Sequence, residues 1–120
     1  MDKVQFFKDR VLFWKEKLLL HDKEYVVTVQ DSLEDARAQF VYNATGQLVT
    51  VEVGKEWLNS EDTSLLDIDT VCFHEMFESQ FGRIYECLDR FYSNEYGQEL
   101  IHPIVHRMSC VIFDRLRDVK

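Results

Sequence analysis

The sequence has few residues that break a chain or make it unusually flexible. It contains one proline and four glycines among 120 residues. Collagen-like and low-complexity chains need far more of both, so these classes are excluded. Hydrophobic residues make up 46% and charged residues 30%, a globular mix that excludes intrinsic disorder. We therefore expect a single folded domain over residues 1–120.

Cysteines and long apolar runs are also scarce. The three cysteines, Cys72, Cys87 and Cys110, are odd in number and far apart, which indicates reduced and mostly buried thiols rather than a disulfide framework. Wholly apolar runs such as 18–20 span only a few residues, whereas a membrane span needs about 20. The N-terminus has no apolar core of a signal peptide. We expect a soluble, cytoplasmic protein without membrane association.

Basic residues are outnumbered by acidic ones. The chain has 14 lysines and arginines against 22 acids, a formal net charge of −8, which makes direct binding to nucleic-acid phosphates unfavourable. The excess is local, because residues 25–70 hold nine acids and two bases. One interpretation is a solvated sheet edge and loop, and the other is an acidic surface for a basic protein partner. The acids of such a surface are Asp31, Glu34, Asp35, Glu52, Glu56, Glu61 and Asp62.

The hydrophobic pattern predicts a helix, then strands, then helices. Apolar residues at three- and four-residue steps, from Val4 to Leu18, indicate the first helix, and alternating or β-branched residues indicate the strands. The predicted helices are 2–19, 68–92 and 98–117. The predicted strands are 25–29, 36–42 and 48–53, the last two forming a hairpin. We expect an α+β fold with an N-terminal helix, a three-stranded antiparallel sheet on one side of the helices, and two C-terminal helices.

One run in the helix predicted at 68–92 carries candidate chemistry. His74, Glu75 and Glu78 form an H-E-x-x-E sequence, in which an imidazole and a carboxylate four residues apart share one helix face. His102 and His106 are also four residues apart, on the last helix. If the two helices pack together, His74, Glu78 and His106, with or without His102, converge on one ion. Such ligands suit zinc, and also manganese, iron or nickel.

The same residues also have structural interpretations. An H-E-x-x-E sequence in an acidic helical protein is typical of a surface patch as well. His102 precedes Pro103 and would then serve as a helix N-cap, with its side chain turned away from the face of His106. The aromatic residues from Phe73 to Tyr85 are typical of a core. The tyrosines can act as acids, but the sequence singles out none of Tyr85, Tyr92 and Tyr96.

The order of elements and the His-Glu pair resemble small phage-encoded zincin-like domains, related in layout to SprT-like metallopeptidases. Segments 14–20, 25–29, 57–58 and 104–108 are similar to the family's first helix, first strand, hairpin end and last helix. The resemblance implies a zinc-dependent peptidase fold. It makes His74 a metal ligand and Glu75 the catalytic base. It places Glu78 where the family has its second histidine. His106 and His102 are further ligands that the resemblance allows.

The replacement of that histidine by Glu78 leaves two expectations open. In one, the protein is a phage-encoded metallopeptidase relative with a weakened or lost hydrolase site. In the other, it is an acidic, non-enzymatic inhibitor in the host cytoplasm. Such an inhibitor mimics nucleic acid and binds a basic host protein, as anti-defence proteins do.

Overall fold

The chain folds into a small sheet covered on one face by helices. The computed structural model describes residues 1–34, 36–43, 47–92, 95 and 97–118. Its strands are β1 (Glu24–Gln30), β2 (Ala38–Asn43) and β3 (Leu48–Gly54). Its helices are α1 (Lys3–Lys17), α2 (Lys55–Asn59), α3 (Leu65–Ser79), α4 (Gly82–Phe91) and α6 (His102–Asp118), with a π-helical turn, η1 (Gly97–Ile101), before α6. The predicted α+β class and the order of its elements are confirmed.

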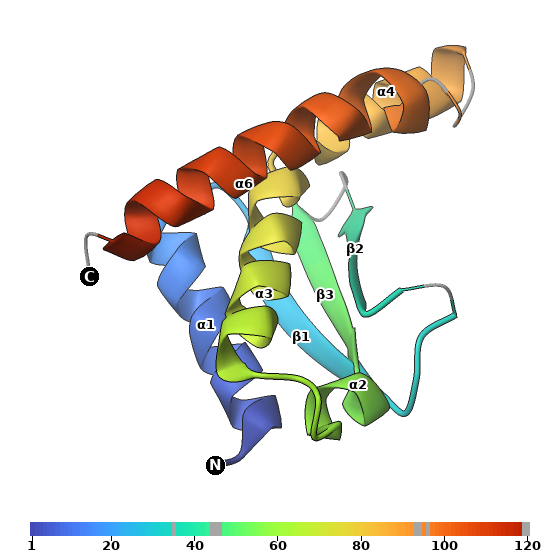
Figure 1. The fold of residues 1–120 in the computed structure, drawn as a ribbon. Coiled ribbons are helices and arrows are strands. Elements are labelled where there is room, and N and C mark those ends of the chain that lie inside the picture. The colour runs from blue at the N-terminus through green and yellow to red at the C-terminus, as the bar shows by residue number, and fades with distance from the viewer. Residues whose placement is uncertain (35, 44–46, 93–94, 96, 119–120) are drawn as a thin grey trace.

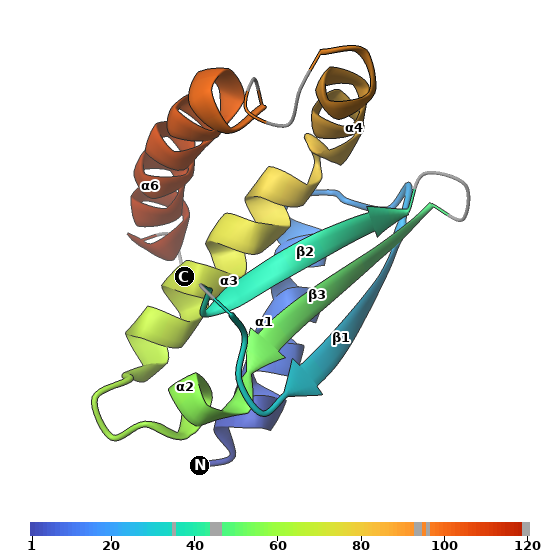
Figure 2. The ribbon, with the colours of Figure 1, turned by 90° about the vertical axis from the view of Figure 1, so that its right-hand side faces the viewer.

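The helices lie in two layers over the sheet. α1 and α3 lie side by side against one face of the sheet, and α6 crosses α3 on the outside (Figures 1 and 2). The other face of the sheet is open, as the alternation of exposed and half-buried residues along β1 shows. None of the described helices is long and apolar enough to cross a membrane. All three cysteines are free, and two of them, Cys87 and Cys110, are exposed rather than buried.

The sheet is mixed rather than antiparallel throughout. Its strand order is β1-β3-β2, with β2 antiparallel to β3 as the predicted hairpin requires, but with β1 parallel to β3. The connection between β1 and β2 explains the difference. β2 lies two strand positions from β1, which leaves a gap for one strand, about 5 Å wide, and β3 then returns into this gap. β2 and β1 are consequently the two edges of the sheet.

The core lies between α1, α3 and the covered face of the sheet. Phe7, Val11 and Trp14 of α1 are fully or almost fully buried, which confirms the predicted apolar face of the first helix. Phe73 of α3 contacts Trp14 edge-on and also contacts Phe113 of α6. This aromatic contact fixes α6 against the two inner helices.

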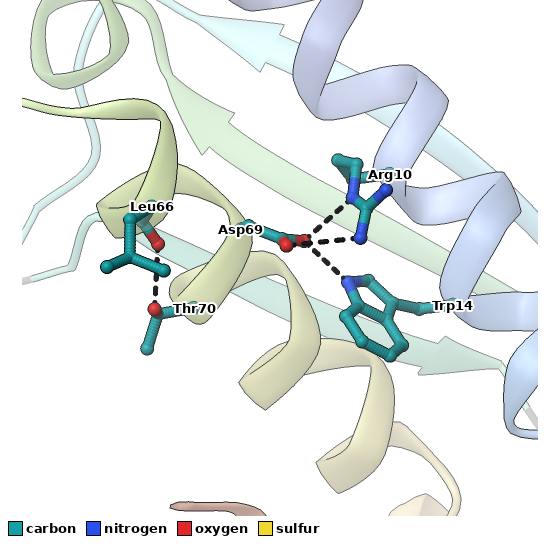
Figure 3. A network of polar contacts seen from close by, with 5 residues as sticks. All are labelled: Arg10, Trp14, Leu66, Asp69 and Thr70. Atoms are coloured by element: carbon teal, nitrogen blue, oxygen red, sulfur yellow. Dashed lines mark hydrogen bonds and ion pairs between the residues drawn. The ribbon is translucent and has the colours of Figure 1, made fainter. Parts of the chain in front are cut away.

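A polar network joins α1 to α3 inside this core (Figure 3). The guanidinium of Arg10 donates to both carboxylate oxygens of Asp69, at 2.8 and 3.1 Å, and the indole N–H of Trp14 donates to the same carboxylate at 2.7 Å. Ser64 is the N-cap of α3 and forms a capping box with Asp67, whereas Asp69 is only 5% exposed and belongs to the network.

The prediction of a single helix over 68–92 is wrong, because the helical segment is interrupted after Ser79. α3 ends there and α4 begins at Gly82, so the two helices point in different directions (Figure 2). Gly82 lies against the ring of Tyr42 on β2, and a Cβ atom on residue 82 would stand only 2.8 Å from the Tyr42 Cγ. This close approach seats the start of α4 on the end of β2.

Candidate metal centre

Three side chains from two helices meet above the edge of the sheet. His74 and Glu78 lie one turn apart on α3, and His102 is the first residue of α6. The Oε2 atom of Glu78 lies 3.1 Å from Nε2 of His74 and 3.1 Å from Nδ1 of His102. The three donor atoms lie within 4.8 Å of one another and could hold a metal ion. The structure therefore brings together three of the four ligands that the sequence suggested.

The donor set of this group suits a divalent cation. Glu78 is only 8% exposed, yet its Oε2 atom and the Nδ1 atom of His102 are buried without a hydrogen-bond partner in the described residues. Buried polar atoms are normally paired, and these atoms face each other at 3.1 Å, so a proton or a cation shared between the carboxylate and the imidazoles would satisfy them. Two imidazoles and one carboxylate are a ligand set that catalytic zinc uses, with a fourth position left open.

His106 lies beside this group but is not one of its three residues. Its ring centre is 5.3 Å from that of His74, whereas its Nε2 atom faces the Cys110 sulfur at 3.9 Å. The residue itself is exposed. Of the two histidines on α6, the one next to Pro103 is therefore the better placed. The alternative N-cap role of His102, which would turn its side chain away, does not match the observed contact with Glu78.

Glu75, the predicted base, borders the group from the next position of α3. Its side chain is 12% exposed, and its Oε2 atom lies 3.9 Å from Nε2 of His74. Burial raises the pKa of Glu75 to about 8; the nearby His74 lowers it and the Glu78 carboxylate raises it further. A proton is thus held easily at this position, which is the property that proton transfer near neutral pH requires.

His74 is shifted in the direction that favours its charged form. The contact with the Glu78 carboxylate raises the pKa of His74, although burial opposes the shift. Two carboxylates and an imidazole within a few ångströms thus form a proton-binding site in the absence of a cation. A divalent ion would compete with these protons, because its ligands must be neutral imidazole and ionised carboxylate.

Two cavities flank the group, and Glu75 borders both. The first, which we call the acidic cleft, has a volume of about 620 Å³. It lies between residues 39–42 of β2 and the residues Glu75, Glu78, Gly82, Tyr85, Glu86, Asp89 and Gln98. The second, the apolar pocket, measures about 460 Å³ and lies between the start of β2, α3 and α6. Its walls include Ala38, Val71, Phe73 and Phe113, together with His74 and His106.

Tyr85 stands out among the tyrosines once the fold is known. Its hydroxyl is buried without a hydrogen-bond partner in the described residues, and it borders the acidic cleft with Glu75 and Glu78. Burial raises the pKa of Tyr85, and the two carboxylates add to this, so the phenol stays protonated. The sequence placed Tyr85 among core aromatics, because an unbroken helix would carry it along the face of His74 and Glu78.

The acids of the predicted partner surface lie away from the metal-ligand group. Five of them, Asp31, Glu34, Glu56, Glu61 and Asp62, are exposed. They belong to the loop after β1, to α2 and to the loop before α3, at the end of the molecule opposite α4 (Figures 1 and 2). Glu52 is half-buried on the open face of the sheet, where Gln30 and Gln39 donate to it. Asp35 lies outside the described residues.

Comparison of the chain with protein-family profiles, with curated proteins and with solved structures finds no match.

Proposed function

We propose that the protein is a metal-dependent hydrolase of the zincin type, with His74, Glu78 and His102 as metal ligands and Glu75 as the general base. The observation that carries the proposal is the convergence of three donor atoms, with the Oε2 atom of the buried Glu78 3.1 Å from each imidazole, beside a carboxyl group that binds protons near neutral pH. A divalent ion there would supply Lewis-acid chemistry, polarising a carbonyl and lowering the pKa of water.

Glu75 has the position and the environment of a proton carrier. It is nearly buried, adjoins His74 and borders both cavities, so it can take a proton from water on one side and return it to a leaving group. A cation at the three ligands would favour the ionised form of Glu75 and bring its pKa down from about 8. The base would then be charged at neutral pH.

The shape of the site favours a peptide substrate. β2 pairs with β3 alone in the described sheet, so its other edge is free of strand pairing and borders the acidic cleft. The main chain of an edge strand offers hydrogen bonds to an extended polypeptide. A peptide laid along β2 would pass beside Glu75 and the three ligands, which supports amide hydrolysis.

Metal titration with matched histidine variants tests the ligand set. Metal-stripped protein is titrated with zinc chloride by calorimetry, and we expect one site that is lost in His74→Ala and in His102→Ala. His106→Ala is the matched control, because it removes an imidazole one turn further along α6 that is outside the three-residue group. Equal zinc binding by the wild type and His102→Ala would reject this ligand set.

A hydrolysis assay tests the reaction. Zinc-loaded wild-type protein is incubated with an unstructured casein fragment, and cleavage is followed by mass spectrometry. We expect Glu75→Gln to bind zinc but to cut at least about 100-fold more slowly, the scale of a lost general base. Zinc binding without cleavage by the wild type would contradict the proposal.

A second candidate function is binding of a basic protein through the acidic end of the molecule. The observation in its favour is that five exposed acids of three separate segments gather there. Binding of lysozyme, as a basic probe protein, tests this function in two double variants. One reverses the charges of Glu61 and Asp62, and the control reverses those of Glu16 and Asp22, which lie outside the acidic end. If both variants bind the probe as the wild type does, this function is rejected.

A further inference from the structure

The acidic cleft has an unbalanced charge that metal binding does not explain. Four carboxyl groups, those of Glu75, Glu78, Glu86 and Asp89, border the cleft, and no lysine or arginine does so among the described residues. Two of the four belong to the site proposed above. Glu86 and Asp89 lie three residues apart on α4, on the face that also carries Tyr85.

Glu86 and Asp89 have no cation of their own. Neither makes an ion pair with any lysine, arginine or histidine in the part of the chain that the structure describes. The buried Oε2 atom of Glu78 also borders the cleft and lies 3.1 Å from the imidazoles of His74 and His102, whereas the buried hydroxyl of Tyr85 lacks a hydrogen-bond partner in the described residues. The α4 side of the cleft therefore carries two carboxylates without a paired cation, and the Tyr85 hydroxyl beside them is open to a ligand.

The remaining wall suits the stem of a long basic side chain. Phe40, Val41 and Tyr42 form the β2 side of the cleft, opposite the carboxylates of α4. The methylene groups of lysine or arginine can pack on such apolar and aromatic surface while the charged end reaches a carboxylate. A cavity of about 620 Å³ is also far larger than a single hydrated ion requires.

We propose that the acidic cleft binds a lysine or arginine side chain of an extended peptide, so that the substrates of the proposed hydrolase are basic polypeptide segments. This inference rests on the proposed function, since it places the basic residue beside the bond that Glu75 would act on. The apolar pocket on the other side of Glu75 is not lined by Glu86 or Asp89, so these two acids favour a basic side chain in the acidic cleft only.

Peptide binding without catalysis tests the inference. Fluorescein-labelled ten-residue peptides that differ only at a central lysine, norleucine or glutamate are titrated with metal-stripped protein, and anisotropy is measured. We expect the lysine peptide to bind about tenfold more tightly than the norleucine peptide, a preference that weakens as salt rises. Equal binding of the lysine and norleucine peptides would overturn the proposal.

Two pairs of variants locate the effect. Glu86→Gln with Asp89→Asn should abolish the lysine preference, and the two single variants serve if the pair does not fold. Glu61→Gln with Asp62→Asn removes two exposed acids from the other end of the molecule and should retain the preference. A preference that survives the changes on α4 would also reject the inference.

The outcome can be separated from that of the hydrolase proposal. Zinc binding and peptide cleavage without any preference for lysine would reject the cationic cleft alone. A lysine preference that depends on Glu86 and Asp89, in a protein that neither binds zinc nor cuts peptides, would support the cleft and reject the hydrolase.

Discussion

The indole nitrogen of Trp14 lies 2.7 Å from a carboxylate oxygen of Asp69, in the interior between α1 and α3. The same carboxylate receives two hydrogen bonds from Arg10, so one buried acid satisfies a buried N–H and a nearly buried guanidinium (Figure 3). The side chains of Arg10 and Asp69 are only 16% and 8% exposed. Removing one partner of such a pair leaves the other charge without compensation.

Asp69→Ala should therefore destabilise the fold by about 3–5 kcal/mol. Asp69→Asn keeps an acceptor oxygen but loses the charge, so its cost should be smaller. Urea denaturation measures both values. Asp62→Ala, at an exposed position, serves as the control and should change the unfolding free energy by less than about 0.5 kcal/mol. A loss below 1 kcal/mol in Asp69→Ala would show that the network contributes little.

The contact between Gly82 and Tyr42 gives a second prediction. Gly82→Ala should destabilise the protein by about 1–2 kcal/mol, because a methyl group 2.8 Å from the Tyr42 Cγ forces the ring away and outweighs the better helix propensity of alanine. Tyr42→Ala makes room for the methyl group. A double-mutant cycle by thermal unfolding should show that Gly82→Ala is harmless in the Tyr42→Ala background. Simple additivity of the two changes would contradict the steric explanation.

The pKa values around His74 predict how pH affects the metal-free protein. The pKa of Glu75 is raised to about 8 and that of His74 is also raised, so the folded state binds protons that the unfolded state releases. Stability is then greatest below the unfolded pKa of Glu75, near 4.5, and falls as pH rises toward about 8. Each unit of pKa difference corresponds to about 1.4 kcal/mol.

Unfolding of metal-stripped protein between pH 5 and pH 8.5 measures this trend. Glu75→Gln should remove much of the decrease, whereas Glu61→Gln, at an exposed position, should leave it unchanged. Added zinc should reverse the trend, because protons compete with the metal for the same ligands. Stability of the metal-free protein that rises over this interval would refute the assignment.

Replacement of Glu78 by histidine tests the resemblance to zincins. Glu78→His should raise zinc affinity about tenfold, since imidazole is a strong zinc ligand and the repulsion between two carboxylates on α3 disappears. Competition with a coloured chelator measures the affinity. Glu86→His, on the cleft but outside the three-residue group, is the control and should leave the affinity unchanged. An unchanged or lower affinity in Glu78→His would count against an ancestral zincin site.

The local elements could be predicted from the sequence because they depend on local patterns. Burial of Phe7, Val11 and Trp14 follows from their spacing along one helix, and the β2–β3 hairpin follows from its alternation and its turn residues. The pairing of β1 with β3 does not, because the residues of β1 indicate a strand but not its neighbour. The position of β2 decides that neighbour, and this position depends on the packing of the whole sheet.

In the candidate site, too, contacts within one helix could be predicted from the sequence, whereas contacts between elements could not. The pairing of His74 with Glu78 follows from four-residue spacing on one helix. The choice of His102 over His106 depends on where α6 crosses α3, and periodicity cannot give that crossing. Likewise, the break after Ser79 brings Gly82 against Tyr42, a residue of the sheet, and places Tyr85 at the acidic cleft.

The ligands on α3 and α6 are far apart in the sequence, with α4 and η1 between them. An ion held by both Glu78 and His102 would be a reversible cross-link that closes a loop of about 24 residues and stabilises the folded state, because the ion binds the folded chain and is released on unfolding. α4 and η1 lie inside that loop. Their amide hydrogens should then exchange with solvent slowly in the loaded protein and quickly after chelation, while those of β3 exchange slowly in both.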